Sequence, residues 1–322
     1  MGIRVSKGQN HIGMTRNRIL VPLDFQRQSD LALKFAGLLA TKLKAMISCM
    51  YVIEEPGLLM DKMAGDQTKH KLRREAENRL SERVHSILPY EENIPFEIMI
   101  TSGKVYQKVL EKSIDLNAQI ILMGRNGSSQ EKTKGMGSNA KRIIAQSMIP
   151  VISVSPQAVD KRKHLILPLD QTKPCTDQLN WAMETALLLD AQVSVLSIIE
   201  RGQSGLRPVY LKKLEEARCI FSERNIACST HLVENHSTIS REIVSFSDRT
   251  EHGIILLMTC YHQKSAGSFR GSVAYKVLDR TEVPVLYVQP RNQFGLSLNR
   301  SSRYFQSMYS SGIPEQDPVT KT

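Results

Sequence analysis

The hydrophobic residues of this chain alternate between short continuous runs and stripes with a helical period. Short apolar runs bounded by Pro, Gly or Asp are typical of strands that are buried on both faces of a parallel sheet. In the first half, such runs predict strands at 18–23, 46–53, 95–101, 119–123 and 151–154. Apolar positions spaced three and four apart predict helices at 29–44 and 104–116. We also expect a long polar helix at 66–88 and a helix that starts at residue 138. We expect Ser29 to cap the first helix.

The same pattern occurs twice in the chain. Residues 19–24 match residues 165–170, and later segments match with a shorter offset, as in Gly137-Ser138 and Gly271-Ser272. The change of offset places about twelve extra residues in the first copy, between positions 55 and 94. The alternation of strands and helices predicts an α/β fold with two tandem Rossmann-like, doubly wound parallel sheets. We expect domains at 16–156 and 162–290, followed by a polar, flexible tail at 291–322.

The most informative motif follows the fourth predicted strand of the first copy. It reads Gly124-Arg-Asn-Gly127, then nine residues, then Gly137-Ser138 at the start of a predicted helix. Glycines allow backbone amides to approach a phosphate, and a helix N-terminus adds unpaired N–H groups and partial positive charge. No Gly-Lys-Ser/Thr of a P-loop follows, and the glycines are too far apart for the dinucleotide fingerprint.

Asp24 ends the first predicted strand, as the glycine motif ends the fourth. In doubly wound sheets, ligands bind beyond the carboxyl ends of strands at the point where the strand order reverses. If these two strands are neighbours, Asp24 and the glycine motif face one crevice and form a nucleotide site. Each residue also has a structural reading, because Asp24 and Ser138 can cap helices and paired glycines are common in turns.

Composition excludes several classes of protein. The chain has 322 residues, 41% of them hydrophobic, and its apolar runs are too short for a membrane span. The net charge is +11, but aromatics make up only 6% and do not interleave with basic residues, so no specific nucleic-acid binding is expected. The five cysteines are odd in number and lack Cys-x-x-Cys spacing, which favours a reducing compartment. We therefore expect a cytoplasmic protein.

The motifs taken together resemble those of the ATP-binding universal stress proteins. The resemblance rests on Val21-Pro-Leu-Asp24-Phe, Tyr51-Val52, the glycine motif and Pro150-Val-Ile-Ser-Val154. It implies that Asp24 accepts a hydrogen bond from the adenine or ribose and that the backbone of Val52 contacts the adenine. It also implies that the remaining motif residues approach the ribose and phosphates, with Arg125 as a charge partner. The expected binding set is Pro22, Asp24, Val52, Gly124, Arg125, Gly127, Gly137, Ser138 and Asn139.

The second copy departs from the motif. Its residues at the positions of Gly124 and Gly127 are Met258 and Tyr261, whose side chains occupy a loop where a phosphate needs bare backbone. We therefore expect one ATP per chain, in the first copy, with a Mg²⁺ or Mn²⁺ ion recruited by the ATP if one is present.

The resemblance also implies that the last strands of the two copies pair within the chain as a pseudo-dimer, and a homodimer of chains stays open. The favoured function is an ATP-binding regulator of a stress response that acts on an unidentified protein partner. The alternatives are a slow ATPase or autophosphorylating enzyme, and a nucleotide-free interaction scaffold. No catalytic residues are expected, because no base or arginine finger for phosphoryl transfer stands out.

Overall fold

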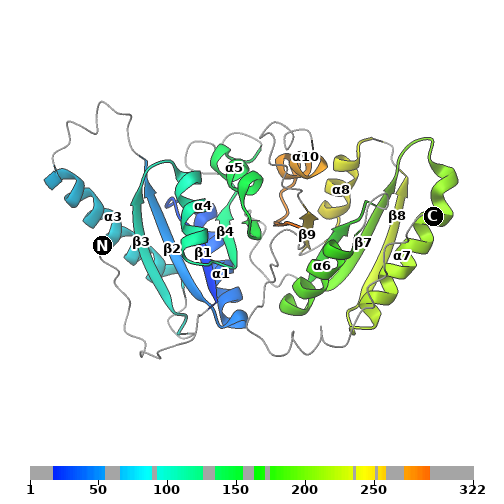
Figure 1. Cartoon of the computed structure of the whole chain (residues 1–322), viewed down its shortest axis with the longest axis horizontal. Coiled ribbons are helices and arrows are strands. Elements are labelled where there is room, and N and C mark those ends of the chain that lie inside the picture. The colour runs from blue at the N-terminus through cyan, green and yellow to red at the C-terminus, as the bar shows by residue number, and fades with distance from the viewer. Residues whose placement is uncertain are drawn as a thin grey trace, which may run out of the picture.

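The described residues of the computed structural model form one continuous sheet with helices on both faces (Figure 1). These residues are 17–54, 66–88, 93–125, 135–154, 163–170, 175–234, 237–250, 253–258 and 272–290. The expected tail at 291–322 lies outside them.

The first repeat alternates strands and helices as its apolar pattern predicts. Its elements are β1 (Arg18–Pro22), α1 (Arg27–Leu43), β2 (Met46–Ile53), α3 (Asp66–Ile87), β3 (Phe96–Ser102), α4 (Val105–Asp115), β4 (Ile120–Gly124), α5 (Ser138–Gln146) and β5 (Val151–Val154). Ile19, Leu20 and Val21 are fully buried, which explains why this strand reads as a continuous apolar run.

The second repeat follows the same order. Its elements are β6 (His164–Pro168), α6 (Thr176–Leu189), β7 (Gln192–Ile199), η2 (Ser204–Leu206), α7 (Arg207–Ser222), β8 (Cys228–Glu234), α8 (Ile239–Asp248), β9 (Gly253–Met258), α10 (Val273–Arg280) and β10 (Val285–Val288).

The ten strands lie in the order β3-β2-β1-β4-β5-β10-β9-β6-β7-β8. Neighbouring strands are parallel within each repeat, and the repeats join where β5 and β10 pair antiparallel, with Leu286 opposite Ile152. This intramolecular pairing confirms the expectation for the last strands. It removes two sheet edges that would otherwise present unpaired backbone groups.

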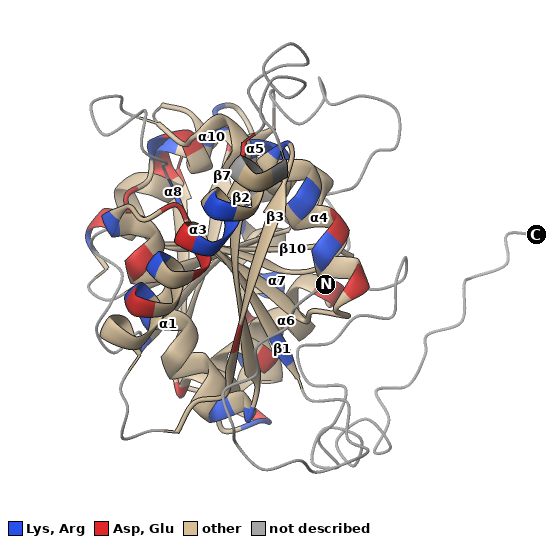
Figure 2. Ribbon diagram, turned by 90° about the vertical axis from the view of Figure 1, so that its left-hand side faces the viewer, with Lys and Arg blue, Asp and Glu red and all other residues tan. Residues whose placement is uncertain are grey.

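Two hydrophobic layers enclose the sheet. One layer packs beneath α1, α3, α6 and α7 and includes Leu33 and Trp181, and the other packs beneath α4, α5, α8 and α10 and includes Val109 and Val277. Figure 2 shows α1 and α3 on one face of the sheet of the first repeat and α4 on the other. The crossovers thus cover both faces, as a parallel sheet requires.

Strand register refines the internal alignment. Ile47 pairs with Phe96, 49 residues later, whereas the equivalent Val193 pairs with Cys228, 35 residues later. The first repeat therefore has 14 extra residues before its third strand. The pairing of β1 with β4 and of β6 with β9 follows the shorter offset seen in the sequence. The second repeat therefore has two more residues than the first between its third and fourth strands.

The predicted cap of the first helix was wrong. The helix begins at Arg27 after Gln26, so Ser29 lies inside its first turn. The Ser29 hydroxyl donates to the carbonyl of Gln26 at 2.9 Å and accepts from the backbone N–H of Asp24 at 3.3 Å. Ser29 thus stabilises the turn that contains Asp24 rather than the end of the helix.

Candidate functional site

The carboxyl ends of β1 and β4 lie side by side. The two strands pair in parallel, with Leu20 opposite Ile121, and β1 has β2 on its other side. Since the next connection from β1 runs to β2 and a later one returns to β4, the strand order reverses here. Asp24 and Gly124 therefore meet at the place where open α/β sheets bind ligands.

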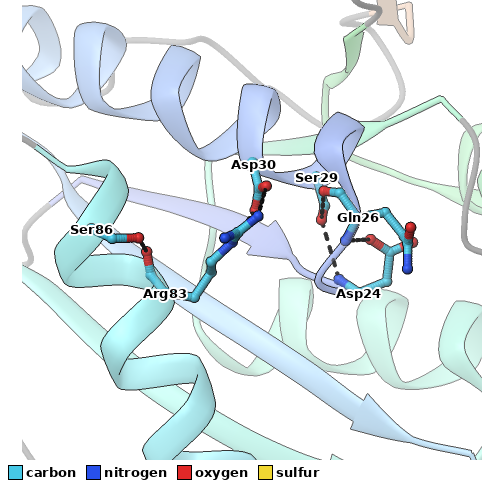
Figure 3. Close-up of polar contacts among 6 residues, drawn as sticks. All are labelled: Asp24, Gln26, Ser29, Asp30, Arg83 and Ser86. Carbon is cyan, nitrogen blue, oxygen red and sulfur yellow. Dashed lines mark hydrogen bonds and ion pairs between the residues drawn. The ribbon is translucent and has the colours of Figure 1, made fainter.

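Asp24 forms a tight turn between β1 and α1 (Figure 3). Its Oδ1 accepts a hydrogen bond from the backbone N–H of Gln26 at 3.1 Å. A carboxylate offers about four acceptor positions, and this turn uses one of them. Within the part of the chain that the structure describes, Oδ2 accepts no hydrogen bond, so the turn and a ligand can engage the same half-buried side chain.

The residue after Asp24 has a strained backbone. Phe25 has φ of 63°, which is uncommon for a bulky side chain. Its ring lies 4.7 Å from the ring of Tyr51, and the guanidinium of Arg79 stacks on it at 4.3 Å. These aromatic and cation–π contacts hold the turn in a conformation that the isolated sequence disfavours. The sequence analysis missed this cluster, because no local pattern encodes a positive φ at Phe.

Helix α3 is tied to α1 beside this turn. Arg83 on α3 forms a bidentate ion pair with Asp30 on α1, and its Nε donates to Oδ1 of Asp30 at 2.9 Å (Figure 3). The hydrogen bonds that Arg83 donates to Asp30, together with the carboxylate charge, raise the pKa of Arg83. Together with Arg79, this pair fixes α3 over the Asp24 turn.

Val52 places backbone groups next to the end of β1. The ladder between β1 and β2 ends with the hydrogen bond from Leu23 N to Met50 O at 2.8 Å, just beyond Pro22. Backbone groups alternate between the two sides of a strand, so the next groups of β2 that face this side belong to Val52. The Val52 side chain itself is buried in the core.

Gly124 has a packing reason to be glycine. A Cβ at this position would lie 2.9 Å from the backbone of Gln28 and of Ser29, at the start of α1. The helix can approach the end of β4 this closely only because no side chain intervenes. The sequence motif suggested bare backbone for a phosphate, and the structure shows that α1 also demands it.

At the start of α5, the backbone N–H groups of Ser138 and Asn139 donate no hydrogen bond to any of the described residues. Gly137 occupies the N-cap position, its N–H donates to Arg125 O at 3.1 Å, and its carbonyl accepts from Lys141 N. Ser138 is the first helical residue and is exposed, and its hydroxyl forms no hydrogen bond within the described residues. Asn139 follows it, half-buried. The first turn contains no acidic residue, so no side chain of that turn offsets the positive end of the helix dipole.

The Arg125 side chain binds the second repeat. It is 8% exposed, and its Nη2 donates to the carbonyl of Leu278 in the second repeat at 2.8 Å. Burial lowers the pKa of its guanidinium. Gly127, the remaining predicted residue, lies outside the described residues.

The same location in the second repeat is built differently. Met258 ends β9 where Gly124 ends β4, and Asp170 follows β6 as an exposed residue. Ser272 is the N-cap of α10, and its hydroxyl accepts a hydrogen bond from Tyr275 N at 3.1 Å. The hydroxyl that is uncommitted in the first repeat is thus used for capping in the second.

The described residues contain no group of three or more His, Cys, Asp or Glu side chains arranged to hold a metal ion. None of the described helices is long and apolar enough to cross a membrane.

A protein-family comparison matches the universal stress protein family model to residues 15–155 and again to residues 161–289. The chain belongs to the universal stress protein family. Universal stress protein MJ0577 of Methanocaldococcus jannaschii is 24% identical over 151 residues, which cover 42% of this chain and 93% of that protein.

Solved structures show the same fold. A universal stress protein from Archaeoglobus fulgidus matches 85% of this chain and 96% of its own, with a TM-score of 0.67 and 18% identity. A universal stress protein solved in complex with cAMP matches 44% of this chain and 98% of its own, with a TM-score of 0.34 and 17% identity. This chain contains two universal stress protein domains in tandem.

Proposed function

We propose that this chain binds ATP in its first repeat and acts as a nucleotide-responsive regulator in the stress response. The observation that carries the proposal is that three features meet at the carboxyl ends of β1 and β4. These are the Asp24 turn at the end of β1, Gly124 at the end of β4, and the start of α5 with the uncommitted Ser138 hydroxyl.

The base and ribose occupy the side of Asp24 and Val52. The unused Oδ2 of Asp24 is a strong acceptor for an amino group or a ribose hydroxyl. The backbone N–H and C=O of Val52 offer a donor and an acceptor that suit the edge of an adenine. Pro22 ends β1 without an N–H of its own, so it leaves no backbone donor to compete there.

The phosphates occupy the side of α5. The amides of Ser138 and Asn139 are among the first N–H groups of the helix, which have no intrahelical acceptor. Together with the helix dipole and the Ser138 hydroxyl, they bind negative charge. A divalent cation would come with the nucleotide, since Mg²⁺ usually retains waters and binds through phosphates.

Binding rather than turnover is the activity that this arrangement supports. Groups that hold the charge already present on bound ATP tighten binding without lowering the barrier to hydrolysis. Phosphoryl transfer also needs charge stabilisation at the transition state, and Arg125, which the resemblance suggested as a charge partner of the phosphates, donates to Leu278 O instead. Turnover on the order of 1 per second or faster would favour the enzyme alternative.

The test is to identify the nucleotide that purified protein releases on denaturation, followed by calorimetric titration of stripped protein with Mg·ATP. We expect ATP or ADP in the released fraction and one site per chain. Two equivalent sites would contradict the assignment to the first repeat. Protein that contains no nucleotide and binds none at millimolar ATP would support the scaffold alternative.

A further inference from the structure

The start of α5 is held by the second repeat across the seam between β5 and β10. Lys141 on α5 forms an ion pair with Asp279 on α10, with Nζ 2.7 Å from Oδ1, and its ammonium lies 5.1 Å from the ring centre of Tyr275. Arg125, just before the loop that leads to α5, donates to Leu278 O at 2.8 Å. Figure 1 shows α5 and α10 facing each other at the middle of the molecule.

A third contact involves the turn that enters α5. Gly135 has φ of 134°, and a Cβ there would lie 2.9 Å from Oδ1 of Asp279. The backbone on both sides of residues 126–134 therefore rests on two consecutive residues of the second repeat, Leu278 and Asp279. The hydrogen bond from Gly137 N to Arg125 O joins these two supported ends.

The two repeats are not equivalent in these contacts. The internal alignment relates Lys141 to Tyr275 and Asp279 to Ala145, so the second repeat has no counterpart of this ion pair. Thr259 stands at the position of Arg125 and Phe269 at that of Gly135. A symmetric seam would repeat the ion pair of Lys141 with Asp279, whereas the aligned residues Tyr275 and Ala145 cannot form one.

We propose that Leu278 and Asp279 are positioning residues for nucleotide binding in the first repeat, although neither would touch the nucleotide. This inference rests on the proposed ATP function. Fixing Arg125, Gly135 and Lys141 orders the start of α5 before ATP arrives, so less of the binding free energy is lost to ordering the phosphate-binding backbone. The second repeat is then a part of the first repeat's site, which explains why a copy with a degenerate motif is retained beside it.

The experiment is calorimetric titration of the full chain with Mg·ATP and with AMP. Asp279→Asn removes the charge of the partly exposed ion pair and should weaken ATP binding roughly fivefold. AMP affinity should change little, because the outer phosphates lie nearest α5. Asp279→Glu should restore most of the ATP affinity, as should the exchange of charges in Lys141→Asp with Asp279→Lys.

A matched control lies at the same seam. Gln289 Nε2 donates to Ser147 O at 3.2 Å, a cross-repeat contact at the far end of α5. Gln289→Met should leave ATP affinity unchanged. A loss of ATP affinity in this variant equal to that of Asp279→Asn would show that any weakening of the seam matters, which would overturn the positioning role.

Amide hydrogen exchange of Gly137 and Lys141, whose N–H groups are hydrogen-bonded, separates this inference from the proposed function when measured in nucleotide-free protein. Faster exchange there in Asp279→Asn, with unchanged exchange in the strands, supports positioning even if the wild-type chain binds no ATP, in which case only the function proposal fails. Wild-type ATP affinity and unchanged exchange in Asp279→Asn would overturn the inference. Equal losses of ATP and AMP affinity with a lowered melting temperature would do the same, since they indicate general destabilisation.

Discussion

The starts of α5 and α10 show how duplicated elements diverge. Ser138 and Ser272 occupy equivalent positions in the two repeats. Ser272 caps its helix through Tyr275 N, whereas Ser138 is the first residue of its helix and its hydroxyl has no partner among the described residues. A helix cap stabilises the fold, while an uncommitted hydroxyl beside free amides favours a ligand. Ser272 thus stabilises its helix, whereas the Ser138 hydroxyl stays available for the proposed nucleotide.

The ends of β4 and β9 differ in the same sense. Gly124 allows α1 to approach the strand closely, whereas Met258 fills the equivalent place with a half-buried side chain. The strand end of the first repeat is therefore packed closely against α1 and depends on the absence of a side chain. In the second repeat, the Met258 side chain packs partly buried against the core at the equivalent position.

The largest effect is expected for Gly124→Ala. The added Cβ would lie 2.9 Å from backbone atoms at the start of α1, and backbone yields less easily than a flexible side chain. We expect a loss of about 2–3 kcal/mol in the free energy of unfolding, measured by urea denaturation. The matched variant Met258→Ala should cost about 1 kcal/mol through lost burial. Similar small costs at both positions would mean that the two strand ends are not as different as the structure indicates.

The next effect concerns the two aspartates that follow β1 and β6. Asp24→Asn can retain the acceptor for Gln26 N and thus the turn, but it replaces a carboxylate with a neutral amide. We expect about a tenfold weaker affinity for Mg·ATP, measured by calorimetry, with a melting temperature within about 2 °C of wild type. Asp170→Asn should leave ATP affinity unchanged. Equal losses from the two variants would place nucleotide in both repeats.

The two serines should respond in opposite ways. Ser272→Ala removes a helix cap and should lower the free energy of unfolding by about 1 kcal/mol without changing ATP affinity. Ser138→Ala removes no cap and should leave stability unchanged, while ATP affinity falls roughly threefold to tenfold. Thermal denaturation and calorimetry on the same preparations check both. A stability loss in Ser138→Ala would show that its hydroxyl caps the helix after all.

Much of the fold could be predicted because local patterns and the repeat agree. Runs such as residues 19–21, buried on both sides, identify parallel strands directly, and the duplication doubles the evidence for each element. Helix starts were less certain, as Ser29 shows. Its hydroxyl serves the preceding turn through Asp24 N, and a Ser near a helix start does not reveal which backbone group it will bind.

The site was predictable where it depends on strand order and less so where it depends on contacts between repeats. Adjacent β1 and β4 bring Asp24 and Gly124 together as expected. The sequence analysis assigned Arg125 to the phosphates because it lies beside the glycine motif. Its actual acceptor, Leu278 O, is 153 residues away, and no local pattern indicates a contact of that range.

The smallest expected effect lies at the amino-terminal ends of the strands, opposite the proposed nucleotide site. In the first repeat, Arg18 and Glu97 form an ion pair at the start of the strands. The Ser48 hydroxyl accepts a hydrogen bond from Arg18 and donates one to Glu97. The equivalent positions hold His164, Ser194 and Ser229, and His231 follows two residues later. Ser229 Oγ lies 3.0 Å from Nε2 of His231, and Gln192 Nε2 lies 3.2 Å from Nδ1 of His164.

This difference predicts that the second repeat is the acid-sensitive one. Burial lowers the pKa of both His164 and His231, and their mutual repulsion lowers that of His164 further. The unfolded chain, whose histidines titrate near about pH 6.5, therefore takes up protons before the folded chain does as the pH falls. Stability is complete above that value and decreases as the pH falls towards the lower folded-state pKa values. Because both rings are partly exposed, we expect less than about 1 kcal/mol from each. Urea denaturation between pH 7.5 and 5.5 should show this loss in wild type and a smaller loss in His164→Gln with His231→Gln, and an identical pH slope in the two proteins would show that these histidines do not make the second repeat acid-sensitive.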